Sequence, residues 1–224
     1  MSTTHPRRSG AQVLIDQLRI HGADTIFGVP GESYLAALDA LYAQRNSIRY
    51  VICRQEGGAA NMAEAYGKLT GKPGIAFVTR GPGATNASIG LHTGFQDSTP
   101  MILLVGQVAR ETTDREAFQE IDYRRMYGQM AKWVAQIDRP ERVPEMISHA
   151  FHLAVSGRPG PVVLALPEDM QVATATVPDT ARYQRVAAHA GAADMNKVRE
   201  MLAKAERPFV MLGGGGWSRS EEHT

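Results

Sequence analysis

Short runs of consecutive apolar residues, bounded by glycine and proline, recur along the first 170 residues of the chain. Residues 75–78, 102–105 and 162–166 are apolar at every position. Strands that are apolar on both faces are typical of parallel sheets, because helices cover such sheets on two sides. Amphipathic segments alternate with these strands, so the sequence predicts an α/β fold with a doubly wound, mostly parallel sheet flanked by helices.

The period of the apolar residues, together with capping signals, gives the expected order of elements. Asp138 and Pro140 mark the start of one helix, and Gly22 suits the end of another. A polar, irregular stretch with one short helix is expected between residues 107 and 131. The expected strands are residues 25–29, 49–53, 75–78, 102–105, 132–137 and 162–166, and the first helices are residues 10–21 and 33–45 and a helix after Glu56.

Changes in composition divide the chain into five segments. We expect residues 1–9 to be disordered and residues 10–170 to form the first domain, followed by a linker rich in alanine, threonine and proline at 171–193. Residues 194–218, with a helix at 194–205 and a strand at 209–212, are expected to be the truncated start of a second α/β domain. A single strand without a sheet is not a domain, so the chain is expected to be a fragment. Residues 219–224 equal a translated sequencing adaptor, and we expect this tail to be non-native.

Composition excludes several classes of protein. Lysine and arginine number 24 against 23 acidic residues, so nucleic-acid or membrane-surface binding is not expected. The single cysteine, Cys53, excludes a disulfide framework and a cysteine-rich metal site. The sequence has neither an apolar signal segment nor an apolar run of membrane-spanning length, so a cytoplasmic location is expected.

Two common phosphate-binding motifs fit the sequence poorly. Tyr66 stands where the first glycine of a P-loop would be required. The turn at residues 81–86 follows a strand and opens a helix, as a dinucleotide-binding turn does. However, Asn86 replaces its third glycine, and no acidic residue ends the next strand. The scattered histidines lack the partners of a zinc site.

Four loops follow expected strands, at residues 28–31, 56–58, 79–86 and 106–108. Ligands of doubly wound sheets bind beyond the carboxyl ends of the strands, so these loops are expected to form the site. Glu56 stands at such an end, before two glycines and a helix. A carboxylate there is either a charge at a helix N-terminus or a group placed for chemistry.

Six motifs occur in the order seen in thiamine-diphosphate-dependent enzymes. The chain most closely resembles the acetolactate synthase (acetohydroxyacid synthase) catalytic subunits, and the resemblance covers roughly residues 10–216. The motifs are Phe27-Gly-Val-Pro-Gly-Glu32, Arg54-Gln-Glu-Gly-Gly-Ala-Ala60 with Met62-Ala-Glu-Ala-Tyr66, Thr79-Arg-Gly-Pro-Gly-Ala-Thr-Asn86, Asp97-Ser-Thr-Pro100, Gly106-Gln-Val108 and Ala117-Phe-Gln-Glu120.

This resemblance implies that residues 10–170 are the pyrimidine-binding domain of thiamine diphosphate. Residues from about 194 then resemble the start of a central domain that carries FAD, and the magnesium site lies in a diphosphate-binding domain beyond Thr224. It also implies a homodimer or tetramer with the active site at the subunit interface, a small 2-oxo acid substrate and a regulatory subunit as a further partner.

The resemblance gives Glu56 the role of the cofactor-activating glutamate. Its carboxylate would bond to the aminopyrimidine ring and favour the imino tautomer, which takes the proton from the thiazolium carbon. Such a site is expected to be dry. By the same resemblance, the cofactor contacts are Val29, Pro30, Thr79, Pro82, Gly83, Asn86 and Gln119, the substrate cavity holds Phe118 and Glu168, and Gly213, Gly214 and Gly215 lie near FAD. A plain strand-end turn explains these last three glycines as well.

Three positions depart from the pattern of the biosynthetic enzymes. Arg80 replaces a common serine, Glu168 a usual lysine and Trp133 a usual histidine, and this puts the particular 2-oxo acid in doubt. A carboxylate at 168 is expected to disfavour an anionic acceptor by about 1–3 kcal/mol. The expected function is a carboligase that decarboxylates pyruvate and joins the two-carbon unit to a 2-oxo acid. The alternatives are another thiamine-diphosphate-dependent decarboxylase or lyase, or a non-catalytic nucleotide-binding module.

Overall fold

The computed structural model describes residues 5–186 and 188–211 of the chain. Its centre is a six-stranded sheet in the order β3-β2-β4-β5-β7-β6, in which every neighbouring pair is parallel. The α/β fold with a parallel sheet is therefore confirmed. In chain order the strands of this sheet are β2 (Thr25–Gly28), β3 (Arg49–Ile52), β4 (Gly74–Val78), β5 (Met101–Gln107), β6 (Trp133–Gln136) and β7 (Pro161–Pro167).

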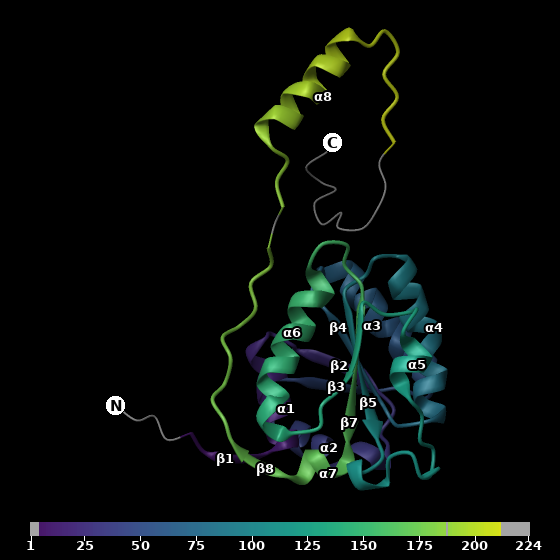
Figure 1. Cartoon of the computed structure of the whole chain (residues 1–224), viewed down its shortest axis with the longest axis vertical. Coiled ribbons are helices and arrows are strands. Elements are labelled where there is room, and N and C mark those ends of the chain that lie inside the picture. Colours follow the sequence, from purple (N-terminus) through teal and green to yellow (C-terminus); the bar gives the residue numbers. More distant parts are fainter. Residues whose placement is uncertain (1–4, 187, 212–224) are drawn as a thin grey trace.

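Helices cover both faces of the sheet (Figure 1). One face carries α1 (Gly10–Ile20), α2 (Leu35–Ala43) and α6 (Val143–Val155). The other carries α3 (Glu56–Thr70), α4 (Pro82–Gln96) and α5 (Tyr123–Tyr127). Shorter elements complete the described chain: 3₁₀ turns η1 (Glu32–Tyr34), η2 (Arg110–Thr112) and η3 (Pro140–Arg142), helix α7 (Glu168–Val172), strands β1 (Arg7–Ser9) and β8 (Thr174–Thr176), and helix α8 (Ala192–Lys204).

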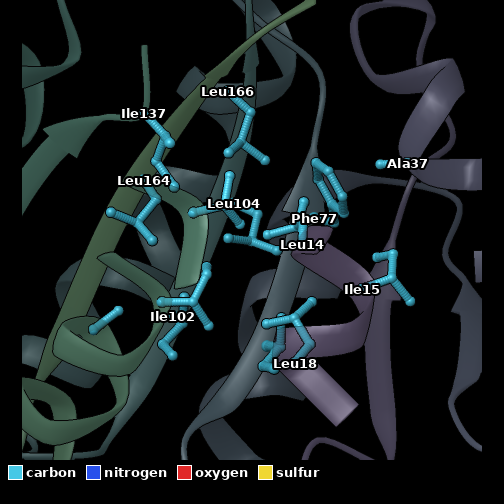
Figure 2. Close-up of a cluster of buried hydrophobic side chains, with 14 of the residues drawn as sticks. Leu14, Ile15, Leu18, Ala37, Phe77, Ile102, Leu104, Ile137, Leu164 and Leu166 are labelled. Carbon is cyan, nitrogen blue, oxygen red and sulfur yellow. The ribbon is translucent and has the colours of Figure 1, made fainter. Parts of the chain in front are cut away.

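The larger core cluster lies between α1, α2, α6 and the sheet. Leu14 and Leu18 of α1 point towards Phe77 and Ile102 of the central strands (Figure 2). All residues of β4, β5 and β7 are buried, which explains their continuous apolar sequences. Burial of each large side chain stabilises the fold by about 1.5–3 kcal/mol, so this cluster fixes the central strands that carry the site loops.

The smaller core cluster contains the close pairing of α3 and α4. A Cβ on Gly90 would lie 2.6 Å from the backbone carbon of Ala60, so the two helix backbones approach each other without side chains between them. Ala63, Ala84 and Ala87 are fully buried around this contact. Small residues therefore bring the two helices together along their length.

The expected disorder of residues 1–9 is wrong for the residues next to α1. Arg7–Ser9 form β1, which pairs antiparallel with β8 (Thr174–Thr176) inside the expected linker. The Arg8 guanidinium bonds to Asp16 at 2.7 Å and to Asp179 at 2.8 Å, and these ion pairs fasten both segments to α1. The first segment is polar, and the second is rich in alanine, threonine and proline without a clear period, so neither is expected to form a strand. Their pairing depends on contacts distant in sequence.

The expected strand at 209–212 is also not formed in its described part, because residues 209–211 have no strand partner. The preceding helix is present as α8, and none of its residues is buried. Gly213–Gly215 and the tail at 219–224 lie outside the described residues, and the division into two domains stays a prediction. Across the described ranges, no helix has the length and apolar character needed to cross a membrane.

Candidate functional site

The paired helices α3 and α4 bring Glu56 and Asn86 into contact. Glu56 is the first residue of α3, which Gln55 caps by accepting a hydrogen bond from the Gly58 N–H at 2.9 Å. Asn86 lies in the first turns of α4. Its side-chain amide donates to Oε2 of Glu56 over 2.9 Å. The contact fixes one carboxylate oxygen at the positive end of the α3 dipole.

The second carboxylate oxygen of Glu56 faces the glycine turn that precedes α4. Within the described residues, no hydrogen-bond donor contacts this Oε1 atom. A Cβ on Gly83 would lie 3.3 Å from Oε1 and 2.8 Å from Cγ2 of Thr79. Glycine at position 83 therefore leaves open the space beside Oε1 that a side chain at this position would occupy. Glu56 is half-buried, so the described residues alone do not create the dry site that the sequence suggests.

Thr79 links this turn to the loop after β2. Its hydroxyl lies 2.8 Å from Oγ of Ser33, a fully buried side chain. A Cβ on Gly31 would approach the Thr79 Cβ to 2.4 Å, so the two loops touch through backbone and a small side chain. The loop carrying Val29 and Pro30 is thus held beside the turn carrying Thr79.

The buried side chain of Tyr34 holds the loop that carries Val29. The Tyr34 hydroxyl donates to the carbonyl of Val29, and its ring stacks on Phe77 with centroids 4.0 Å apart. The Tyr50 hydroxyl lies 3.1 Å from that of Tyr34. Burial raises the pKa of both phenols, which therefore stay neutral donors. Sequence reasoning missed Ser33, Tyr34 and Tyr50, because their role depends on contacts between separate loops.

The segment around Gln119 lies against Gly81. Gln119 has φ of 64° and Gly81 has φ of 60°, and a Cβ on Gly81 would lie 2.7 Å from the Cβ of Gln119. The Gly81 N–H donates to the Tyr123 hydroxyl at 3.1 Å. Burial raises the pKa of Tyr123 to about 12, which keeps this acceptor neutral.

The remaining predicted site residues lie around these contacts. Pro30 and Pro82 are exposed, and the Phe118 side chain is 70% exposed. Glu168 begins α7 and pairs with Arg80, a contact that the sequence did not predict. The structure thus brings Asn86 into contact with Glu56 and places Gly83 beside both Glu56 and Thr79, with the other described candidates at the same edge of the sheet. Their roles in binding or catalysis stay predictions.

The chain matches the family described as "Thiamine pyrophosphate enzyme, N-terminal TPP binding domain" over residues 8–126, which is more than half of its length. It belongs to the thiamine pyrophosphate enzymes. The matched region contains β2, β4 and the loops that hold Glu56, Thr79 and Gln119.

Curated relatives of the chain include acetolactate synthases. The acetolactate synthase of Arthrospira platensis is 38% identical over 217 residues, which cover 93% of this chain and 38% of that protein. The acetolactate synthase isozyme 2 large subunit of Escherichia coli is 37% identical over 210 residues, covering 92% and 37%. The mitochondrial acetolactate synthase catalytic subunit of Saccharomyces cerevisiae is 33% identical, covering 96% and 33%. The chain therefore spans between 33% and 38% of the length of these relatives.

The residues at the site fit the pyrimidine end of thiamine diphosphate. Oε1 of Glu56 is an open acceptor, as a ring N–H donor requires, and Gly83 keeps the space beside it free of a side chain. Among the described residues, no three histidine, cysteine or carboxylate side chains are grouped to hold a metal ion.

Proposed function

We propose that this chain is the N-terminal part of a thiamine-diphosphate-dependent carboligase of the acetolactate synthase type. The complete enzyme decarboxylates pyruvate and joins the two-carbon unit to a second 2-oxo acid. The observation that carries the proposal is the Glu56 carboxylate, held through Oε2 by Asn86 and open at Oε1 beside a glycine turn. Family membership and the acetolactate synthase relatives support it.

When bound, thiamine diphosphate supplies the carbon nucleophile. Glu56 accepts a hydrogen bond from the pyrimidine ring at Oε1 and exchanges a proton at that atom. Asn86 orients the carboxylate by occupying Oε2. The proposed remaining contacts to the ring come from the loops at Val29, Pro30, Thr79, Pro82, Gly83 and Gln119.

We place the other half of the site on a second subunit, in a homodimer or tetramer. Glu56 is only half-buried, so a further surface is needed to exclude water from it. The outer sides of α3 and α4 expose Met62, Leu69 and Ile89, and Ile52 at the end of β3 is also exposed. An apolar surface of this kind beside the site suits a subunit interface. Magnesium, FAD and a regulatory subunit would bind parts of the complete enzyme outside the described residues.

A second candidate function is a different thiamine-diphosphate-dependent 2-oxo acid decarboxylase or lyase. The observation in its favour is that Glu168 and Glu32 both pair with Arg80, which leaves no unpaired cation in this cluster for a second carboxylate substrate. Product analysis with pyruvate alone, and with pyruvate plus an aldehyde, separates the two functions.

The test is Glu56→Gln in the full-length protein. Glutamine keeps the shape but cannot exchange a proton, so turnover should fall by about 10²–10⁴-fold, the usual contribution of a positioned acid or base. Deuterium exchange at the thiazolium carbon of bound cofactor should slow as well. Glu145→Gln, at an exposed residue of α6, is the matched control and should change neither quantity. If the Glu56→Gln variant exchanges deuterium at the wild-type rate, Glu56 serves only as a helix N-terminal charge.

A further inference from the structure

Arg80 is a charged side chain with almost no contact with solvent. It lies in the turn between β4 and α4, between Thr79 and Gly81, and its side chain is 9% exposed. A buried guanidinium is costly unless acceptors surround it. The acceptors around the Arg80 guanidinium therefore indicate which segments this side chain holds in place.

The three nitrogens of the Arg80 guanidinium bond to three separate segments. Nε donates to the carbonyl oxygen of Phe118 at 2.9 Å. Nη1 lies 3.3 Å from Oε2 of Glu168, at the start of α7. Nη2 lies 3.1 Å from Oε1 of Glu32, in η1. Because the guanidinium is planar and its donors have fixed directions, these bonds fix the three segments relative to the turn.

The Phe118 segment needs such support, because its backbone is strained. Asp114, Glu116 and Gln119 have backbone φ angles of 61°, 54° and 64°. Residues other than glycine rarely adopt such positive values. The Phe118 ring is 70% exposed and so contributes little packing. The bond from Arg80 holds the carbonyl immediately before Gln119. This contact is well placed to keep the strained conformation.

We infer that Arg80 is a positioning residue for the candidate site. Its Nε–H holds the Phe118–Gln119 backbone against Gly81, while Glu168 and Glu32 compensate its charge and fix the plane of the guanidinium. Gly83, two residues further along the same turn, faces Glu56. The inference rests on the proposed function only where it has Gln119 contact the cofactor. The hydrogen bond from Arg80 to the Phe118 carbonyl does not depend on that function.

The test compares Arg80→Lys, Arg80→Ala and a control in the full-length protein by amide hydrogen–deuterium exchange. Lysine keeps the charge beside the two carboxylates, but all its N–H donors lie on one nitrogen, so it cannot reach the Phe118 carbonyl as well as Glu168 and Glu32. Exchange in a peptide covering residues 113–121 should become about tenfold faster or more in both variants, while exchange in β4 and β5 stays unchanged. Arg110→Ala removes the ion pair with Asp169, at 2.7 Å, without touching Phe118, and should leave the peptide unchanged.

Kinetics then separate positioning from plain structural support. A positioning role predicts that KM for a substrate or the Kd of thiamine diphosphate rises about tenfold in Arg80→Lys, with the melting temperature close to wild type. Unchanged exchange in residues 113–121 would overturn the inference, as would faster exchange with unchanged KM and Kd. A full-length protein without cofactor-dependent activity, but with faster exchange in the variants, would instead refute the proposed function and keep the backbone role of Arg80.

Discussion

Acid should destabilise this chain through His21, which the fold holds in its neutral form. The side chain is 1% exposed and stacks on Phe151 with ring centroids 4.9 Å apart. The Tyr183 N–H donates to Nδ1 at 3.0 Å, so this nitrogen carries no proton. Nε2–H then donates to the Thr180 hydroxyl at 3.1 Å. Protonation of Nδ1 would place a hydrogen against the Tyr183 N–H.

The sign and size of the effect follow from the pKa of His21. Burial, with smaller contributions from His152 and Arg182, lowers this pKa from 6.5 to about 4. The unfolded chain therefore binds the proton first as the pH falls. The stabilisation is complete above pH 6.5 and is lost as the pH approaches about 4. At pH 4.5, the linkage relation gives a loss of about 2–2.5 kcal/mol in the free energy of unfolding.

The assay is urea unfolding of the 224-residue chain at pH 7.5 and pH 4.5. Between the two pH values, the free energy of unfolding should fall by about 2–2.5 kcal/mol more in wild type than in His21→Gln, because the variant has no imidazole to bind this proton. His92→Gln, at an exposed residue of α4, is the matched control and should follow wild type. Equal losses in wild type and His21→Gln would refute the reasoning, whatever the stability of the variant at pH 7.5.

Three further predictions concern packing and the accessibility of the Cys53 thiol. Gly74→Ala should lower the free energy of unfolding by about 3 kcal/mol or more, because its Cβ would lie 1.8 Å from the carbonyl oxygen of Ala63; unchanged urea unfolding would contradict this close contact. Thr99→Val should cost about 1–3 kcal/mol in the same assay, since it removes the 2.8 Å hydrogen bond to the buried Glu64 carboxylate. Burial raises the pKa of the Cys53 thiol, so iodoacetamide should label the native chain at pH 8 about tenfold more slowly than the urea-unfolded chain; equal labelling rates would show that the thiol is accessible.

Most elements of the sheet domain could be predicted because their signals are local. The apolar run at 75–78 became β4, which begins one residue earlier, and the run at 162–166 became β7, which is one residue longer at each end. β5 extends to Gln107, beyond the expected end at 105, because Gly106 and Gln107 pair with Leu166 and Pro167 of β7. Glycine and glutamine have no strong preference for strands, so the sequence does not predict this extension. It depends on pairing with the adjacent strand β7.

The contacts that build the candidate site were less predictable, because they join residues distant in sequence. Nothing near Ser33 indicates that its hydroxyl meets Thr79, 46 residues later. The pairing of Glu56 with Asn86 required the close approach of α3 and α4, which depends on small residues such as Gly90. Sequence motifs named several residues at this edge, whereas the hydrogen bonds between them required the fold.

The pairing of Arg80 with Glu168 changes what the charge at 168 means. Considered from sequence alone, Glu168 is an uncompensated carboxylate that would repel an anionic acceptor. In the structure its carboxylate lies 3.3 Å from Arg80, which also pairs with Glu32 at 3.1 Å. One cation beside two partly exposed carboxylates leaves a single net negative charge, which water screens. The repulsion from position 168 is therefore weaker than the sequence suggests, and a lysine there would face Arg80. Exchanging Glu168 alone would disturb the support of the Phe118 segment as well as the charge, so acceptor preference has to be tested on residues 80 and 168 together.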